Sequence, residues 1–165
     1  MWGTFINFAA KLENWRMRFL GNIEAKTDQK GRVFLPSVFR KELQTSDEER
    51  LVMRKDVHQK CLVLYPESAW NRRMDEMFMK ADEWDATEKE VLRTYMKGAE
   101  VLTLDGSGRI LIPNRYLEWA GIGQTASFIG MNDTIEIWAA ENVDEPKLTQ
   151  EEFAEKLKAI MGRTL

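Results

Sequence analysis

One short motif occurs twice in this chain, and the repeat constrains the fold more than any other feature of the sequence. The copies begin at Asp28 and at Asp105 and read Asp-Gln-Lys-Gly-Arg and Asp-Gly-Ser-Gly-Arg. In both copies three apolar residues and a proline follow the arginine. A short acidic side chain that accepts from nearby backbone N–H groups, followed by a glycine, is typical of a tight turn. Each copy therefore predicts a strand, a tight turn that closes a hairpin, a returning strand and, after the proline, a short helix.

The similarity between the two halves extends beyond the motif. The runs Leu62–Tyr65 and Ile135–Trp138 each follow their copy as a β-rich stretch that ends in an aromatic residue. Self-similarity of this kind predicts a duplicated β-rich unit. The residues expected to form the two turns are Asp28, Gly31, Asp105 and Gly108.

Hydrophobic periodicity and capping signals place the other elements. Strands are expected at residues 20–26, 51–53, 61–65, 100–104, 110–113, 127–130 and 134–139. Helices are expected at 37–43, from 66 onward, from 85 to 98, at 114–120 and at 149–161. The second and third of these helices form a helical hairpin between the repeats. Its methionine-rich stripe is predicted to pack in a core, the alternative being a promiscuous binding surface.

The charge of the chain is unevenly distributed. A net charge of −3 argues against a uniformly basic protein that coats nucleic acid. Residues 16–43 nevertheless hold seven basic residues against three acidic ones, a local charge of +4, and the tail from residue 141 is acidic. A solvated face explains most charge runs, so this pattern alone leaves nucleic-acid binding open.

The inventory of reactive side chains is small. The chain has one cysteine, Cys61, and one histidine, His58, so it predicts no internal disulfide, zinc site or catalytic triad. We therefore expect no enzyme activity, no catalytic residue, no metal, no cofactor and no small-molecule substrate. Residues 1–16 are apolar at first but lack the pattern of a signal peptide or a membrane span, and we expect them to pack on a neighbouring surface.

Three interpretations of the doubled motif remain open on the residues alone. In the first, each aspartate only caps its turn and pairs with the arginine four residues later. In the second, the two aspartates share a proton as in aspartic proteases, but an arginine beside each carboxylate would keep both ionised. The third interpretation is contact with nucleic acid, because lysine and arginine neutralise phosphates and arginine can grip guanine with two N–H groups.

The nucleic-acid interpretation favours the first copy. Lys30 and Arg32 flank a glycine at its tip, and three more basic residues lie on segments that could share its face, namely Arg18, Lys26 and Arg40. In the second copy Ser107 replaces the lysine, which leaves Arg109 as the basic residue of that motif. If the chain binds DNA, the first hairpin is predicted to dominate the contacts with it.

Several motifs together resemble the MraZ family of bacterial transcriptional regulators. They are Phe19-Leu20-Gly21, the two Asp-x-x-x-Arg motifs, and Leu64-Tyr65-Pro66 followed by Trp70. A single copy resembles the wider AbrB-like family of SpoVT-AbrB domains, whose members are swapped-hairpin dimers. The resemblance implies an α+β fold: a duplicated AbrB-like swapped-hairpin β-barrel with a helical hairpin between the repeats and a C-terminal helix.

The same resemblance implies a division of the chain and a function. The division is an extension at 1–16, a first AbrB-like repeat at 17–70, the helical hairpin at 71–98, a second repeat at 99–145 and the C-terminal helix at 146–165. The function is that of a cytoplasmic, nucleoid-associated DNA-binding protein that forms a homo-oligomeric ring. It would bind double-stranded DNA at short direct repeats and repress the division and cell-wall gene cluster, including its own gene.

Carried over by position, the family's DNA contacts fall on Arg32, Lys30 and Arg109. The alternative function is an AbrB-like oligomerising protein-interaction or antitoxin-type module with weak or no DNA binding. A shift of operator DNA at two salt concentrations distinguishes the two.

Overall fold

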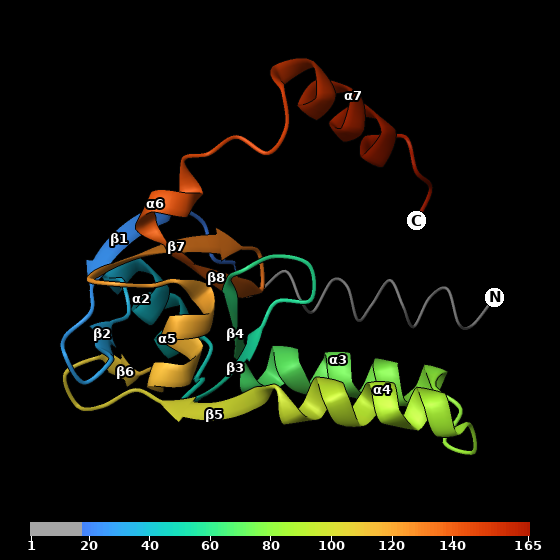
Figure 1. Ribbon diagram of the computed structural model, residues 1–165, viewed down its shortest axis with the longest axis horizontal. Helices are drawn as coiled ribbons and strands as arrows, with labels where there is room; N and C mark the ends of the chain where they lie inside the picture. Colours follow the sequence, from blue (N-terminus) through green and yellow to red (C-terminus); the bar gives the residue numbers. More distant parts are fainter. Residues whose placement is uncertain (1–17) are drawn as a thin grey trace.

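The computed structural model describes residues 18–165, so the predicted packing of residues 1–16 lies outside the described residues. This part of the chain is a mixed α+β structure of antiparallel sheets and six helices (Figure 1). No helix in it is both long and apolar enough to cross a lipid bilayer.

The elements follow the same order in both halves of the chain. The first half contains β1 (Asn22–Lys26), β2 (Arg32–Phe34), α2 (Ser37–Thr45), β3 (Arg50–Lys55) and β4 (Leu62–Pro66). The second half contains β5 (Ala99–Thr103), β6 (Arg109–Leu111), α5 (Asn114–Ala120), β7 (Thr125–Met131) and β8 (Thr134–Ala139). Between them lie α3 (Glu67–Lys80) and α4 (Ala86–Lys97), and after them α6 (Ala140–Val143) and α7 (Gln150–Met161). The predicted duplication is therefore confirmed.

Strand pairing joins the two halves rather than closing each one. The first strand of each half pairs with the third strand of the other, β1 with β7 and β5 with β3, and β4 pairs with β8 at the centre. The six-stranded sheet has the order β1-β7-β8-β4-β3-β5, and β2 and β6 pair separately with each other. The two predicted motif hairpins, β1 with β2 and β5 with β6, are wrong beyond their tips, where one isolated bridge joins Thr27 to Val33. The other adjacent strands do pair within each half, β3 with β4 and β7 with β8.

Burial gives the physical reason for this exchange. Each returning strand has one fully buried side chain, Val33 or Ile110, and pairing β2 with β6 puts both into one core. The same core takes Phe39 from α2 and Tyr116 from α5, and Phe128 from β7 lies in it as well. Fully burying each large apolar side chain contributes about 1.5–3 kcal/mol. A shared core is larger than either half could form alone, so the halves stabilise each other.

The helical hairpin of α3 and α4 packs on the sheet only near its base. There Trp70 stacks on Tyr95 at 5.8 Å and meets Tyr65 edge-on at 5.3 Å. At the far end Phe78 and Trp84 are 50% and 89% exposed. The prediction that this stripe packs in a core is thus confirmed at the base of the hairpin and wrong at its tip, where no third element within residues 18–165 covers the two helices.

An ion pair fixes α3 to the turn between β7 and β8. Arg73 donates from Nη1 and Nη2 to the two carboxylate oxygens of Asp133, at 3.0 and 2.8 Å. Asp133 is 7% exposed. Desolvation lowers the pKa of Arg73, but the hydrogen bond and charge of Asp133 outweigh it and raise that pKa overall. A bidentate pair of this kind holds its two segments in one relative orientation.

The last helix is capped as predicted but lies apart from the sheet. The Thr149 hydroxyl accepts from the Glu152 N–H at 3.1 Å, and the Glu152 carboxylate accepts from the Thr149 N–H, which completes the capping box. Figure 1 shows α7 at the end of an extended connection that leaves the body after α6. Its predicted apolar side, Phe153, Leu157 and Ile160, is about half exposed.

Candidate nucleic-acid interface

The first motif forms a tight turn held by its own aspartate. Asp28 Oδ1 accepts from the backbone N–H groups of Lys30 and Arg32, both at 2.9 Å, and Oδ2 accepts from Arg32 Nε at 2.8 Å. Gly31 has φ +86°, and a Cβ there would lie 2.4 Å from the Ile112 carbonyl oxygen. The position therefore requires glycine both for its backbone conformation and for the close approach of the neighbouring chain.

The second motif repeats this geometry. Asp105 Oδ1 accepts from the N–H groups of Ser107 and Arg109 at 2.9 Å, and Oδ2 accepts from Arg109 Nε at 2.8 Å. Gly108 has φ +84°. Its nearest side chain is Arg40 of α2, whose Nη1 donates to the Ser107 carbonyl at 3.4 Å. The predicted cap and the predicted aspartate–arginine pair are thus present in both copies.

The hydrogen bonds decide the charge of the motif carboxylates. Acceptance from the Arg32 backbone N–H, with further hydrogen bonds, lowers the pKa of Asp28, and the Arg109 N–H does the same for the pKa of Asp105. Each carboxylate is therefore ionised at neutral pH and paired with its own arginine. The alternative in which the two aspartates share a proton does not fit this arrangement.

Arg32 and Arg109 lie on the same exposed face of the β2–β6 ribbon. In its antiparallel register Arg32 pairs with Leu111 and Phe34 pairs with Arg109. Alternation buries the middle residue of each strand and leaves these four side chains on the outer face. The two arginines are diagonal neighbours, about 7–8 Å apart along the ribbon. Figure 1 shows the loops that carry both motifs at the same edge of the body, left in this view.

Each motif arginine is bound to its aspartate through Nε, and its terminal Nη groups remain available to contact another molecule. Nε of Arg32 is bound to Asp28, and within residues 18–165 neither Nη group of Arg32 has a hydrogen-bond partner. Arg109 lies over the Phe34 ring, with 5.8 Å from Cζ to the ring centroid. A two-stranded ribbon fits the DNA major groove, where arginine donates to guanine O6 and N7. The face thus presents two oriented guanidinium groups.

The other predicted residues lie in different places. Lys30 is exposed at the first turn, and Lys26, at the end of β1, lines a pocket with Asp28. Arg18 precedes the opposite end of β1, and its N–H donates to Glu42 Oε1 at 3.0 Å. Because Phe19 bridges Asn132 at the far end of β7, Arg18 lies about 25 Å from the first turn. Arg40 lies against the second turn, where its Nη1 donates to the Ser107 carbonyl.

Sequence reasoning missed two groups of residues. Phe34 stands beside the arginines, and the period-two pattern of Arg-Val-Phe could have placed it on their face. The turn before β7, with Gly123 and Gln124, lines the pocket beside the first motif, and its position depends on pairing between the halves, which no local signal indicates.

Three potential metal ligands meet elsewhere, away from the ribbon. Ligand atoms of Asp56, Cys61 and Glu136 lie within 4.8 Å of one another. Burial, together with the two carboxylates, raises the pKa of the Cys61 thiol to about 12, so the thiol is protonated at neutral pH. The carboxylates already accept hydrogen bonds, Asp56 from the backbone of His58 and Gln59, and Glu136 from the Trp138 indole. A metal would bind here only if the thiol lost its proton.

Comparison with known proteins identifies the family. The sequence profile described as "MraZ protein, putative antitoxin-like" matches twice, over residues 18–94 and 95–163. The chain belongs to the MraZ family. A protein of Phocaeicola vulgatus named transcriptional regulator MraZ is 55% identical over 146 residues, which covers 88% of this chain and 95% of that protein.

More distant relatives carry the same name. A transcriptional regulator MraZ of Bacteroides thetaiotaomicron is 49% identical over 146 residues, 88% of this chain and 94% of that protein. One of Yersinia pestis is 27% identical over 150 residues, 86% of this chain and 98% of that protein. The resemblance seen in the motifs is thereby confirmed, and membership of a family of transcriptional regulators confirms that the chain is not an enzyme.

Proposed function

We propose that this MraZ family protein regulates transcription by binding double-stranded DNA with the β2–β6 ribbon. The observation that carries the proposal is the outer face of the ribbon, where Arg32 and Arg109 are oriented by Asp28 and Asp105. An arginine fixed at Nε loses less side-chain entropy on binding than a free one, so the fork reaches guanine at a lower cost. Lys30 and Lys26, beside the first turn, supply contacts to phosphates.

The proposal includes an AbrB-like barrel. In AbrB-like proteins with a single copy of the motif, two chains exchange hairpins to form a dimer. Here β1 pairs with β7 and β5 pairs with β3, which is the exchange expected when both partners are fused in one chain. The division at residues 17–70, 71–98, 99–145 and 146–165 remains part of the proposal.

Self-assembly into a ring completes the proposal. One ribbon contacts few phosphates, and a chain of net charge −3 repels DNA as a whole, so a single copy would bind weakly at physiological salt. Two separate apolar surfaces support head-to-tail association: the α3–α4 tip with Phe78 and Trp84, and the α7 side with Phe153 and Leu157. Several ribbons on one ring would bind direct repeats through a high effective concentration.

The regulated genes follow from the family resemblance. We propose that the protein represses the division and cell-wall gene cluster, with its own gene, from the cytoplasmic nucleoid. The competing function is a protein-interaction or antitoxin-type module that assembles but binds DNA weakly or not at all.

Binding to DNA from upstream of its own gene tests the proposal directly. We expect a shifted complex with this duplex, a weaker one with a scrambled duplex of equal length, and a steep loss of affinity with added salt. Light scattering should give a mass several times that of the 19.3 kDa chain. Equal affinity for both duplexes, or none for either, would favour the interaction module.

A further inference from the structure

The first motif turn lies beside a turn donated by the second half of the chain. Beside the first turn, the β1–β7 pairing continues past Lys26 and Thr125. The Thr27 N–H donates to the Gln124 carbonyl at 2.9 Å, and the Thr27 hydroxyl donates to the Gly123 carbonyl at 2.5 Å. The turn before β7 is therefore fixed against the first motif.

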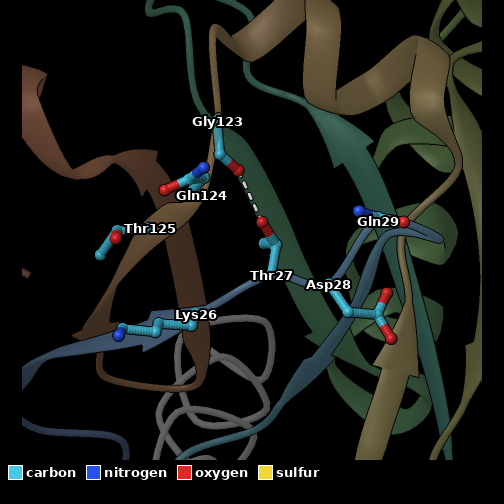
Figure 2. A pocket seen from close by; sticks show the side chains of 7 residues that line it. All are labelled: Lys26, Thr27, Asp28, Gln29, Gly123, Gln124 and Thr125. Atoms are coloured by element: carbon cyan, nitrogen blue, oxygen red, sulfur yellow. Dashed lines mark hydrogen bonds between the residues drawn. The ribbon is translucent and has the colours of Figure 1, made fainter.

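The two segments line an open pocket of about 400 Å³. It is lined by Lys26, Thr27, Asp28, Gln29, Gly123, Gln124 and Thr125. In Figure 2 the side chains of Gln124 and Thr125 lie on one side of Thr27, and Asp28 and Gln29 lie on the other. The pocket offers the ammonium of Lys26 and amide N–H donors, while the carboxylate of Asp28 is already neutralised by Arg32. Ammonium and amide N–H groups are donors of the kind that contact DNA phosphates.

The corresponding turn beside the second motif has the opposite character. There β3 pairs with β5, and Arg50 is opposite Thr103. Glu49 directly precedes Arg50, as Gln124 directly precedes Thr125, so the two residues hold equivalent positions in the duplicated fold. The turn before β3 contains three consecutive acidic residues, Asp47, Glu48 and Glu49. Arg40, which reaches the second turn, offsets only part of this negative charge.

We propose that the pocket beside the first motif seats a DNA backbone phosphate, and that the acidic turn before β3 keeps the backbone away from the second motif. The inference rests on the proposed DNA binding, and it assigns the polarity of that binding, meaning which of the two motif turns lies against the DNA backbone. A phosphate is attracted to Lys26 and accepts from the Gln124 amide, whereas it is repelled at the equivalent position by Glu49. The ribbon therefore lies obliquely in the groove, with the backbone following the first turn.

A pair of reciprocal substitutions tests this polarity. Gln124→Glu gives the first side the charge of the second, and we expect it to weaken operator binding about tenfold at low salt. Glu49→Gln is the matched control at the equivalent position, and we expect it to bind as tightly as the unmodified protein or more tightly. Both side chains are exposed, and the backbone bond of Gln124 to Thr27 is kept, so the thermal midpoints should not change.

Lys26→Ala supplies a second measurement of the same pocket. Removing one phosphate contact should reduce the slope of log affinity against log salt by about 0.9 per ribbon engaged. This loss should be equal on operator and scrambled DNA, since a phosphate contact carries no sequence information. A loss confined to the operator would mean a base contact and would overturn the phosphate assignment.

The outcomes separate this inference from the proposed function. If Arg32→Ala abolishes operator binding while Gln124→Glu leaves it unchanged, the ribbon reads DNA and the pocket does not. If Glu49→Gln weakens binding as much as Gln124→Glu, the polarity is wrong. If the unmodified protein binds no DNA, both the inference and the proposed function fail.

Discussion

Replacing Arg32 with alanine should abolish recognition of the operator while leaving the fold intact. The substitution removes a guanidinium whose side chain is 38% exposed and whose contact within the described chain is with Asp28. It keeps the Arg32 backbone N–H, which donates to Asp28 Oδ1, so the turn can still close. Val33 next to it remains buried in the core. We therefore expect the thermal midpoint and the assembled mass to stay close to those of the unmodified protein.

The size of the binding loss follows from the two nitrogens that Arg32 leaves unbound. A bidentate contact to guanine contributes about 1–3 kcal/mol of discrimination, which is about 5- to 150-fold in affinity for each ribbon engaged. Arg32→Lys keeps one positive charge but removes both the fork and the geometry of the Nε bond to Asp28. It should retain most binding to scrambled DNA and abolish the preference for the operator.

Fluorescence anisotropy with labelled operator and scrambled duplexes, at two salt concentrations, measures both quantities. Circular dichroism and light scattering verify the fold and the assembly of each variant. Unchanged operator affinity of a folded, assembled Arg32→Ala protein would refute the role of the ribbon. An equal loss on both duplexes would show that Arg32 contacts phosphate rather than a base.

Three further predictions concern the second motif, stability and pH. Arg109→Ala should reduce operator affinity less than Arg32→Ala does. An equal loss of affinity in the same anisotropy assay would contradict the prediction that the first motif dominates DNA binding. Arg73→Ala, which removes both arginine hydrogen bonds to the buried Asp133, should destabilise the fold by about 1–3 kcal/mol in urea unfolding. Arg72→Ala, 3.8 Å from the same carboxylate, is the control and should cost less. Because folding lowers the pKa of Asp28, its stabilisation is present above the unfolded pKa and should disappear in acid titrations below about pH 4.

A related test concerns the lysine that the second motif lacks. Lys30→Ser should weaken binding to all sequences and reduce the salt slope by about one for each phosphate that the variant no longer neutralises. Ser107→Lys should not reduce binding. A fall in affinity in the Ser107→Lys protein would mean that the second turn cannot tolerate a longer side chain near the DNA.

Features that depend on neighbouring residues were predictable from the sequence. The turns of Asp28 and Asp105 and the caps at Asp85 and Thr149 each use atoms within four residues, so composition at fixed spacing specifies them. The helix end at Gly121, with φ +68°, is of the same kind.

Features that depend on partner choice were not predictable. A strand as short as Arg32–Phe34 satisfies its backbone equally well with β1 or with β6, and only the shared core favours β6. The separation of Arg18 from the motif and the meeting of Asp56, Cys61 and Glu136 follow from registers between distant strands. The motif turns of the candidate site could therefore be predicted from neighbouring residues. Its ribbon and its pocket could not, because they depend on pairing between distant strands.

The exchange of strands between the halves has a consequence for synthesis on the ribosome. β1 cannot pair until β7 has been made, and β4, which pairs with β3 on one side, gains its second partner, β8, only near the end of the body. Nearly the whole chain must therefore emerge before the sheet can form, and Leu62, Leu64 and the rest of the first half's core side chains stay without their cover until then. Pairing across so many residues is slow compared with local folding, and the waiting strands are the segments most open to association with other chains. Stalling translation before β7 should leave a nascent chain that proteases cut readily, whereas a chain released past Ala139 should resist them.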